Sequence, residues 1–414
     1  MNVASLEFLL GLFALGAAFF LLPGHLSRRC ALFVLNLAVL YLANPAPLSW
    51  ILLGVFLVTG YGTALWARAR SAKGAVALYL AVFTLVFVIL KRYDFLLPLL
   101  PGLILEHPIL ITGLSYIFFR QVHFIVDAIQ GQIENPSFWT YLNYQLNFFC
   151  LLSGPIQRYQ DFASYWVAPE PRPASREEVL RAFLRILIGV GKVTVLAAAL
   201  LMAYDRMGEW RLTWLSQANA APLPVTLAWF LGMLYAYPLY VYLNFAGYCD
   251  IVIGGAFLIG MRLPENFDRP YLSRNLIDFW TRWHRTLGFW VRDYIFTPLY
   301  MALAKRSPQA ASRWAFACYF VAFFLVGMWH GSNLKIVVFA LLHGIGVSAA
   351  KLWEAWLLKR GGRAGLRKYL ESRPIRALAV FLTLHYFVFT VLFFPTHLAA
   401  EATPLHALLA WLQW

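Results

Sequence analysis

Apolar residues of this chain gather in runs that are long enough to cross a membrane as helices. A helix needs about 20 apolar residues to span ~30 Å of hydrocarbon. Runs of roughly this length lie at residues 6–22, 31–48, 50–66, 74–90, 108–128, 138–153, 179–203, 223–243, 245–262, 314–329, 335–352 and 377–396. We therefore expect an all-α polytopic membrane protein with about ten to twelve membrane helices, several of them re-entrant or tilted.

The longest polar interruption is VAPEPRPASREEVLR, residues 167–181. Its three prolines are followed by Ser175 and Glu178, which have the spacing of a capping box. A helix should begin there and continue into the apolar run near 180–203. No internal repeat or long linker divides the chain, so we expect one membrane domain over residues 1–414. The first apolar run follows Glu7 with no basic residue ahead of it, which favours a retained span over a cleaved signal peptide.

Composition and charge agree with a membrane protein. Hydrophobic residues make up 61% of the chain and charged residues 13%, and the mean hydropathy is +0.65. The net charge of +15 would suggest nucleic acid in a soluble protein. Here the basic residues lie in short loops beside apolar runs, so we expect topology signals and no nucleic-acid partner. Residues 351–376 carry eight lysines and arginines against two glutamates, which predicts a cytoplasmic loop near anionic headgroups.

One stretch, FWTRWHRTLGFWVRDY at 279–294, gathers arginines and aromatic rings. If residues 276–294 form one helix, the tryptophans share one side and Arg282, Arg285 and Arg292 lie opposite, so the helix should be amphipathic and interfacial. His284 falls in the apolar sector. It either satisfies a buried carbonyl or serves as a neutral imidazole that faces a cavity where protons move.

A second polar cluster is GMWHGSN at 327–333, between two apolar runs. Ionisable groups at membrane depth are costly and are candidates for function. His330 is the best single candidate for chemistry. His343 lies inside the next apolar run, where we expect a structural role.

Two histidines without a carboxylate pair, a metal-ligand cluster or a phosphate-binding glycine loop fit acyl transfer. A neutral imidazole can take the proton of a hydroxyl that attacks a thioester carbonyl, and Asn or Trp N–H groups can stabilise the oxyanion. No GxSxG motif is present, so direct transfer is favoured over an acyl-enzyme. The four cysteines lack metal-ligand spacing, and we expect no metal. The same residues would also permit a transporter that relays protons.

The chain resembles the membrane-bound O-acyltransferases, in particular the bacterial branch that modifies envelope glycans. The resemblance covers about residues 110–346 and is strongest at 244–299 and 327–333. It implies a ring of helices around a central funnel. It also implies that His330, in the WHG motif, is the catalytic base and that His284, in the RWH motif, lies across the site. We expect Trp283, Trp329, Ser332 and Asn333 to contact substrate.

Two subgroups of the branch remain open. The sequence TPLYMALAKR at 297–306 departs from the pattern of alginate-type O-acetylation proteins, whereas SGPI at 153–156 favours the D-alanyl-transfer subgroup. The resemblance implies no permanent cofactor and a thioester donor, either a phosphopantetheine carrier protein or acetyl-CoA, at the cytoplasmic side of the bacterial inner membrane. The acceptor would be an envelope glycan. An acyl conduit that serves a separate extracytoplasmic transferase is the alternative.

Overall fold

We describe a computed structural model of the chain. It describes residues 5–22, 24–43, 46–70, 73–93, 96–99, 111–167, 175–216, 222–331 and 333–407. Within these ranges the chain is almost entirely helical and contains no strand. The chain forms two compact units, Met1–Leu187 with Cys249–Asn266, and Ile188–Tyr248 with Phe267–Trp414.

The first unit contains the N-terminal helices. They are α1 (Leu6–Leu21), α2 (Gly24–Ala43), α3 (Pro47–Arg70), α4 (Lys73–Lys91), α6 (Leu114–Ile129), α7 (Phe138–Leu146) and α8 (Tyr159–Val167). Buried polar groups join them. The Tyr159 backbone N–H donates to His123 Nε2 at 2.8 Å, and Gln160 donates to Asp127 at 2.6 Å. Arg185 lies 3.0 Å from Asp250, and this ion pair joins two helices.

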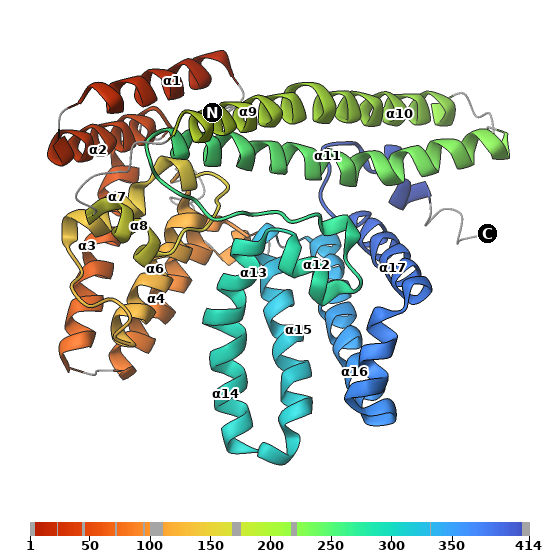
Figure 1. Cartoon of the computed structure of the whole chain (residues 1–414). Coiled ribbons are helices and arrows are strands. Elements are labelled where there is room, and N and C mark those ends of the chain that lie inside the picture. The colour runs from red at the N-terminus through yellow and green to blue at the C-terminus, as the bar shows by residue number, and fades with distance from the viewer. Residues whose placement is uncertain are drawn as a thin grey trace. The chain divides into compact units, whose positions relative to one another are not determined.

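The second unit holds the segments that carry both histidine motifs. Its helices are α10 (Ala198–Ser216), α12 (Leu276–Arg282), α13 (Arg285–Val291), α14 (Thr297–Arg306), α15 (Ala311–His330), α16 (Leu334–Glu371) and α17 (Arg373–Val391). Helices α9 (Arg176–Gly191) and α11 (Leu223–Leu258) each contribute to both units. Helices α14 to α17 stand side by side, and the α14–α15 and α16–α17 turns lie at the same end (Figure 1).

Eight helices of the described chain are long and apolar enough to cross a membrane. This confirms a multi-pass membrane protein but gives fewer full-length spans than the ten to twelve expected. Two predicted spans, 223–243 and 245–262, are largely one 36-residue helix, α11. The predicted span 138–153 instead holds the nine-residue α7 and a 3-10 turn, too short to cross. Many large apolar side chains point outward, among them Leu21 and Leu42 at 84% and 80% exposure, as lipid contact requires.

The start of α9 follows the sequence prediction. The Glu178 N–H donates to Ser175 Oγ at 3.2 Å, and the Ser175 N–H donates to Glu178 Oε2 at 3.0 Å. These reciprocal bonds confirm the capping box. The helix then continues through a π-helical turn, Lys192–Ala197, into α10. The single membrane domain over residues 1–414 stays a prediction, and the structure is described as two compact units.

Candidate functional site

The segment 276–294 is not the single helix that its pattern predicts. Helix α12 ends at Arg282, Trp283 is extended, and His284 has φ 43° and ψ 50°, in the left-handed region. Helix α13 then begins at Arg285. Because a left-handed conformation is unfavourable for a residue other than glycine, the surrounding packing must hold His284 in place. The prediction of one continuous helix is therefore wrong at Trp283 and His284, where the RWH motif forms a sharp turn.

Both short helices are fixed locally. Asn275 caps α12 by accepting a bond from the Asp278 N–H at 2.8 Å, and Asp278 in turn pairs with Arg282 at 2.7 Å. Gly288 of α13 packs on α12 so closely that a Cβ there would lie 2.8 Å from the Trp280 carbonyl oxygen. The tight contact places His284 at the corner between the two helices.

The predicted division into an apolar and a polar side is confirmed although the helix is broken. Trp280, Trp283, Leu287 and Trp290 are buried, whereas Arg292 is exposed. Arg282 and Arg285 are half-buried. Packing of the apolar side against α16 and α17 therefore decides where the turn lies.

Trp283 lies in an aromatic cluster. Its ring centroid is 5.6 Å from that of Phe279 and 5.2 Å from those of Phe267 and Phe387. The residue is 8% exposed and lines neither of the pockets described below. Its position supports a role in holding the turn, and its contact with substrate stays a prediction.

His284 is buried, with 4% of its surface exposed, and its ring meets Phe245 edge-on at 4.9 Å. It lies outside the eight candidate spans. Burial, with a smaller effect from the nearby His330, lowers the pKa of His284 to about 3. The imidazole is therefore neutral at physiological pH, which fits both sequence interpretations, the satisfied buried carbonyl and the proton-handling cavity.

His330 is the last residue of α15, and its side chain is exposed. Its ring lies 4.6 Å from that of Trp329 and 5.2 Å, edge-on, from that of Phe394. The sequence analysis placed His330 as an ionisable group between two apolar runs, and the structure puts it where α15 ends, with its side chain exposed. The exposed ring is accessible to a substrate.

The turn after His330 leads directly into α16. Asn333 caps α16 by accepting a bond from the Ile336 N–H at 3.0 Å, so its carbonyl oxygen already has a partner. Ser332 lies outside the described residues. Gly327 packs on Ala340, where a Cβ would come within 2.2 Å of the Ala340 Cβ. This contact fixes α15 against α16 one turn before His330.

His343 on α16 has both ring nitrogens engaged. Trp280 Nε1–H donates to Nδ1 at 3.3 Å, and Nε2 lies 3.0 Å from the Thr390 hydroxyl, which itself donates to the Phe387 carbonyl at 2.7 Å. Nε2 must therefore carry the proton and donate it to Thr390. A neutral imidazole held in one tautomer joins α12, α16 and α17, which confirms the structural role predicted for His343.

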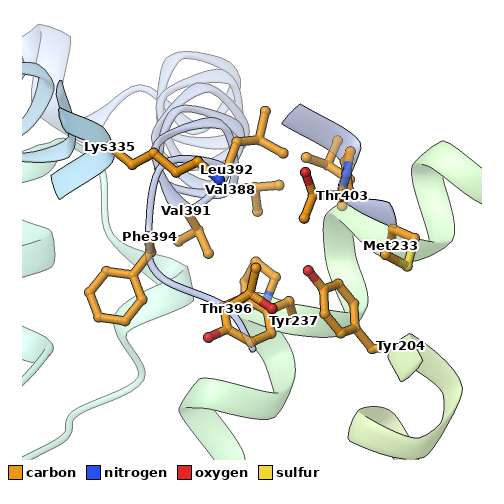
Figure 2. A pocket seen from close by; sticks show the side chains of 13 residues that line it. Tyr204, Met233, Tyr237, Lys335, Val388, Val391, Leu392, Phe394, Thr396 and Thr403 are labelled. Atoms are coloured by element: carbon orange, nitrogen blue, oxygen red, sulfur yellow. The ribbon is translucent and has the colours of Figure 1, made fainter. Parts of the chain in front are cut away.

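Two pockets in the second unit flank these residues. An apolar pocket with a volume of about 130 Å³ is lined by residues of α12, α13 and α15, including Trp280. A smaller and more polar one, with a volume of about 20 Å³, is lined by Phe394 together with Lys335 and several hydroxyl groups (Figure 2). Phe394 is thus shared between the His330 contacts and the polar pocket, whereas Trp280 is shared between the His343 contacts and the apolar pocket.

Three functional candidates were missed in the sequence. Trp280 and Thr390 hold His343, but they lie 63 and 47 residues away from it, and no local pattern joins them. Lys335 had a visible signal, because it is a lone cation at the start of an apolar run. Among the described residues, no group of three or more His, Cys, Asp or Glu is placed to hold a metal ion.

Comparison with known proteins identifies the family. The model of the membrane-bound O-acyltransferase family matches residues 110–393. A teichoic acid D-alanyltransferase of Bacillus subtilis is 31% identical over 67% of this chain and 66% of the relative, and one of Streptococcus thermophilus is 28% identical over 68% and 67%. A probable alginate O-acetylase of Pseudomonas fluorescens is 29% identical over 60% of this chain and 46% of the relative.

The match includes both histidine motifs, the break between α12 and α13, and the turn between α15 and α16. It covers more than half of this chain, although the alignments reach only about two thirds of the D-alanyltransferases and less than half of the alginate protein. The helical fold and the apolar spans agree with it. This multi-pass membrane protein therefore belongs to the membrane-bound O-acyltransferase family, and acyltransferase is thereby its enzyme class.

Proposed function

We propose that this protein transfers an acyl group, D-alanyl or acetyl, from a cytoplasmic thioester to a hydroxyl of an extracytoplasmic envelope glycan, with His330 as the general base. The observation that carries the proposal is the contrast among three histidines of one unit. His284 and His343 are buried, and His330 alone among the three presents an exposed ring. A base must reach the proton that it removes.

The reaction follows from the chemistry of a neutral imidazole. A ring nitrogen of His330 accepts the proton of the acceptor hydroxyl while the hydroxyl oxygen attacks the thioester carbonyl. The tetrahedral intermediate then collapses, the C–S bond breaks, and the imidazolium returns its proton to the leaving thiolate. The Trp329 ring contacts that of His330, and N–H groups of Trp329 and Asn333 are side-chain candidates to bind the oxyanion or the substrate.

His284 serves this base as a positioning residue. It is neutral, and its ring lies close enough to His330 for the two imidazoles to influence each other electrostatically. A neutral imidazole beside His330 adds no positive charge when His330 takes up a proton. A charged one would oppose that step by like-charge repulsion.

The relatives indicate which acyl donor and which acceptor to test. The D-alanyltransferases share the larger part of their length with this chain, which favours a D-alanyl group on a phosphopantetheine carrier protein. Acetyl-CoA is the second donor to test, because the alginate-type relatives also match. The basic segment 351–376 offers positive charge to an acidic carrier. The membrane is then the bacterial inner membrane.

The test uses the purified full-length protein in nanodiscs with each donor and a short glycan acceptor. Mass spectrometry follows both loss of the thioester and formation of the ester. We expect ester formation without any other protein, and His330→Ala should slow it by about 100- to 10,000-fold. The matched control is His385→Ala, which removes a histidine of α17 whose one hydrogen bond to the described residues is with the Phe381 carbonyl.

The outcomes separate the candidate functions. Normal turnover by a folded His330→Ala protein would exclude His330 as the base. Thioester loss that needs an added extracytoplasmic transferase would favour the acyl conduit. If neither donor is ever consumed, with or without such a partner, acyl transfer is refuted and proton-coupled transport becomes the better reading.

A further inference from the structure

The polar pocket near His330 is assembled from four parts of the second unit. Its lining residues are Tyr204, Met233, Leu234, Tyr237, Pro238, Lys335, Val388, Val391, Leu392, Phe394, Thr396, Thr403 and Pro404. Most of the wall is apolar, and the polar groups are one ammonium and four hydroxyls. Figure 2 shows Lys335 extended toward the pocket from α16 and the Tyr204 hydroxyl pointing into it.

Lys335 has a charge that nothing in the described chain balances. Its side chain is half-buried, and none of the described residues forms a hydrogen bond or an ion pair with its ammonium. The acidic residue beside the pocket, Asp205, is engaged by His397 at 2.7 Å. The ammonium nitrogen is not among the fully buried polar atoms of the described residues, so water can solvate it. A ligand with negatively charged oxygens would replace that water with a charged partner.

The hydroxyls of the pocket can add only a little to such a site. Tyr237 already donates to the Pro395 carbonyl at 2.5 Å, and Thr403 donates to the Ala400 carbonyl at 2.6 Å. Tyr204 and Thr396 bond to each other. Since two hydroxyls that share one hydrogen bond keep one O–H in reserve, that pair can still donate once. The pocket thus offers an ammonium and one O–H to an anionic oxygen.

The pocket lies next to the base and far from the basic turns. Phe394 lines the pocket and contacts the His330 ring. Val388, Val391 and Leu392 line it from the end of α17 opposite to the basic segment. Helix α17 has 19 residues and is therefore about 28 Å long, close to the thickness of the hydrocarbon core. With the basic turns in the cytoplasm, the pocket is on the acceptor side.

We propose that this pocket is the subsite for an anionic group of the acceptor, a phosphodiester or a carboxylate, and that Lys335 makes the protein prefer charged glycans over neutral ones. The proposal rests on the proposed acyl transfer and adds the charge of the acceptor to it. It places the anion one aromatic ring away from His330, so that a neighbouring hydroxyl of the same polymer can reach the base.

The test compares Lys335→Met, which removes the charge and keeps an unbranched stem, with Lys335→Arg, which keeps the charge. Lys91→Met is the matched control, because Lys91 is also half-buried, lies at the end of α4 and lines neither pocket. The acceptors are a short poly(glycerol phosphate), an oligomannuronate, and a neutral gluco-oligosaccharide of equal length. We expect Lys335→Met to raise the KM for at least one anionic acceptor by about tenfold or more.

The KM for the donor and the kcat should change much less than the KM for the acceptor, and Lys335→Arg should restore most of the affinity. Added salt should weaken wild-type binding more than binding by Lys335→Met. An unchanged anionic KM in Lys335→Met overturns the proposal. So does an equal loss with the neutral acceptor.

Direct binding separates this proposal from acyl transfer itself. The same oligomers are titrated onto His330→Ala protein, with and without Lys335→Met, in phosphatidylcholine nanodiscs. Tight anionic binding that needs Lys335 supports the subsite even if no donor is ever consumed. Transfer activity with no effect of Lys335 overturns the subsite and leaves the transferase intact. An effect of Lys335 seen only when phosphatidylglycerol is added assigns the pocket to a lipid headgroup and overturns the acceptor assignment.

Discussion

Three imidazoles of the second unit differ in what their nitrogens can do. His343 is held in one tautomer by Trp280 and Thr390, so it cannot pass on a proton without breaking those bonds. His284 is buried and neutral. His330 is exposed at the end of α15. Burial and hydrogen bonding, more than residue type, therefore make His330 the one of these three that a substrate can reach, as the proposed base requires.

The low pKa of His284 predicts an acid-sensitive fold. Histidine in an unfolded chain titrates near 6.5, whereas folded His284 titrates at about 3. Below pH 6.5 the unfolded state binds a proton that the folded state does not, so stability is lost as the pH falls from 6.5 toward 3. At pH 5 the loss is about 2 kcal/mol. Thermal unfolding in detergent at pH 7 and pH 5 measures it.

His284→Asn should remove this part of the pH dependence, because asparagine does not titrate and tolerates the left-handed backbone. His385→Asn serves as the control and should keep it. If wild type and His284→Asn lose the same stability between pH 7 and pH 5, His284 is not the group responsible.

At the scale of elements, sequence signals between neighbouring residues predict the helix start at α9, whereas contacts between distant segments decide where α12 and α13 break. The capping box at Ser175 and Glu178 involves residues three apart, and the structure forms it as predicted. The break between α12 and α13 has no such signal. It arises because Trp283 packs among rings from distant segments, including Phe387, while Gly288 draws α13 onto α12. Hydrophobic periodicity alone continues through that break.

The candidate site shows the same limit. The sequence motifs located His284 and His330, and the exposure of His330 came only with the end of α15. The polar pocket combines residues 204, 237, 335 and 394–404. No pattern within one segment predicts that these meet. The sequence signal for this pocket is Lys335, a lone lysine beside the His330 motif, and its role becomes apparent only from the residues that line the pocket with it.

Contact between α15 and α16 should control both stability and activity. In Gly327→Ala the new Cβ would overlap Ala340, and the two helices would have to separate, at a cost of about 1–3 kcal/mol. Because His330 follows within one turn, transfer should slow as well. Gly361→Ala, in α16 with open space around it, should be as stable as wild type or more so. Denaturation and transfer assays compare the two; equal behaviour would argue against the tight contact.

At the scale of the whole molecule, charge predicts orientation. The α14–α15 and α16–α17 turns lie at one end of their helices, and both carry basic residues (Figure 1). We expect this end in the cytoplasm. In a cysteine-free background, Gln309→Cys and Gly361→Cys should react with an impermeant maleimide only in opened cells. Ala400→Cys should react in intact spheroplasts. Labelling of all three from outside would contradict this topology.

In the proposed mechanism, the exposed ring of His330 leaves the acyl donor open to hydrolysis. A base that solvent can reach activates water as well as a glycan hydroxyl, and an attack by water would hydrolyse the thioester with nothing gained. Protection must then come from order of arrival, with the acceptor seated before the activated acyl group. A pocket that holds the polymer beside the base would enforce that order. The rate of thioester hydrolysis in the absence of polymer thus measures how well the protein protects the activated acyl group from water.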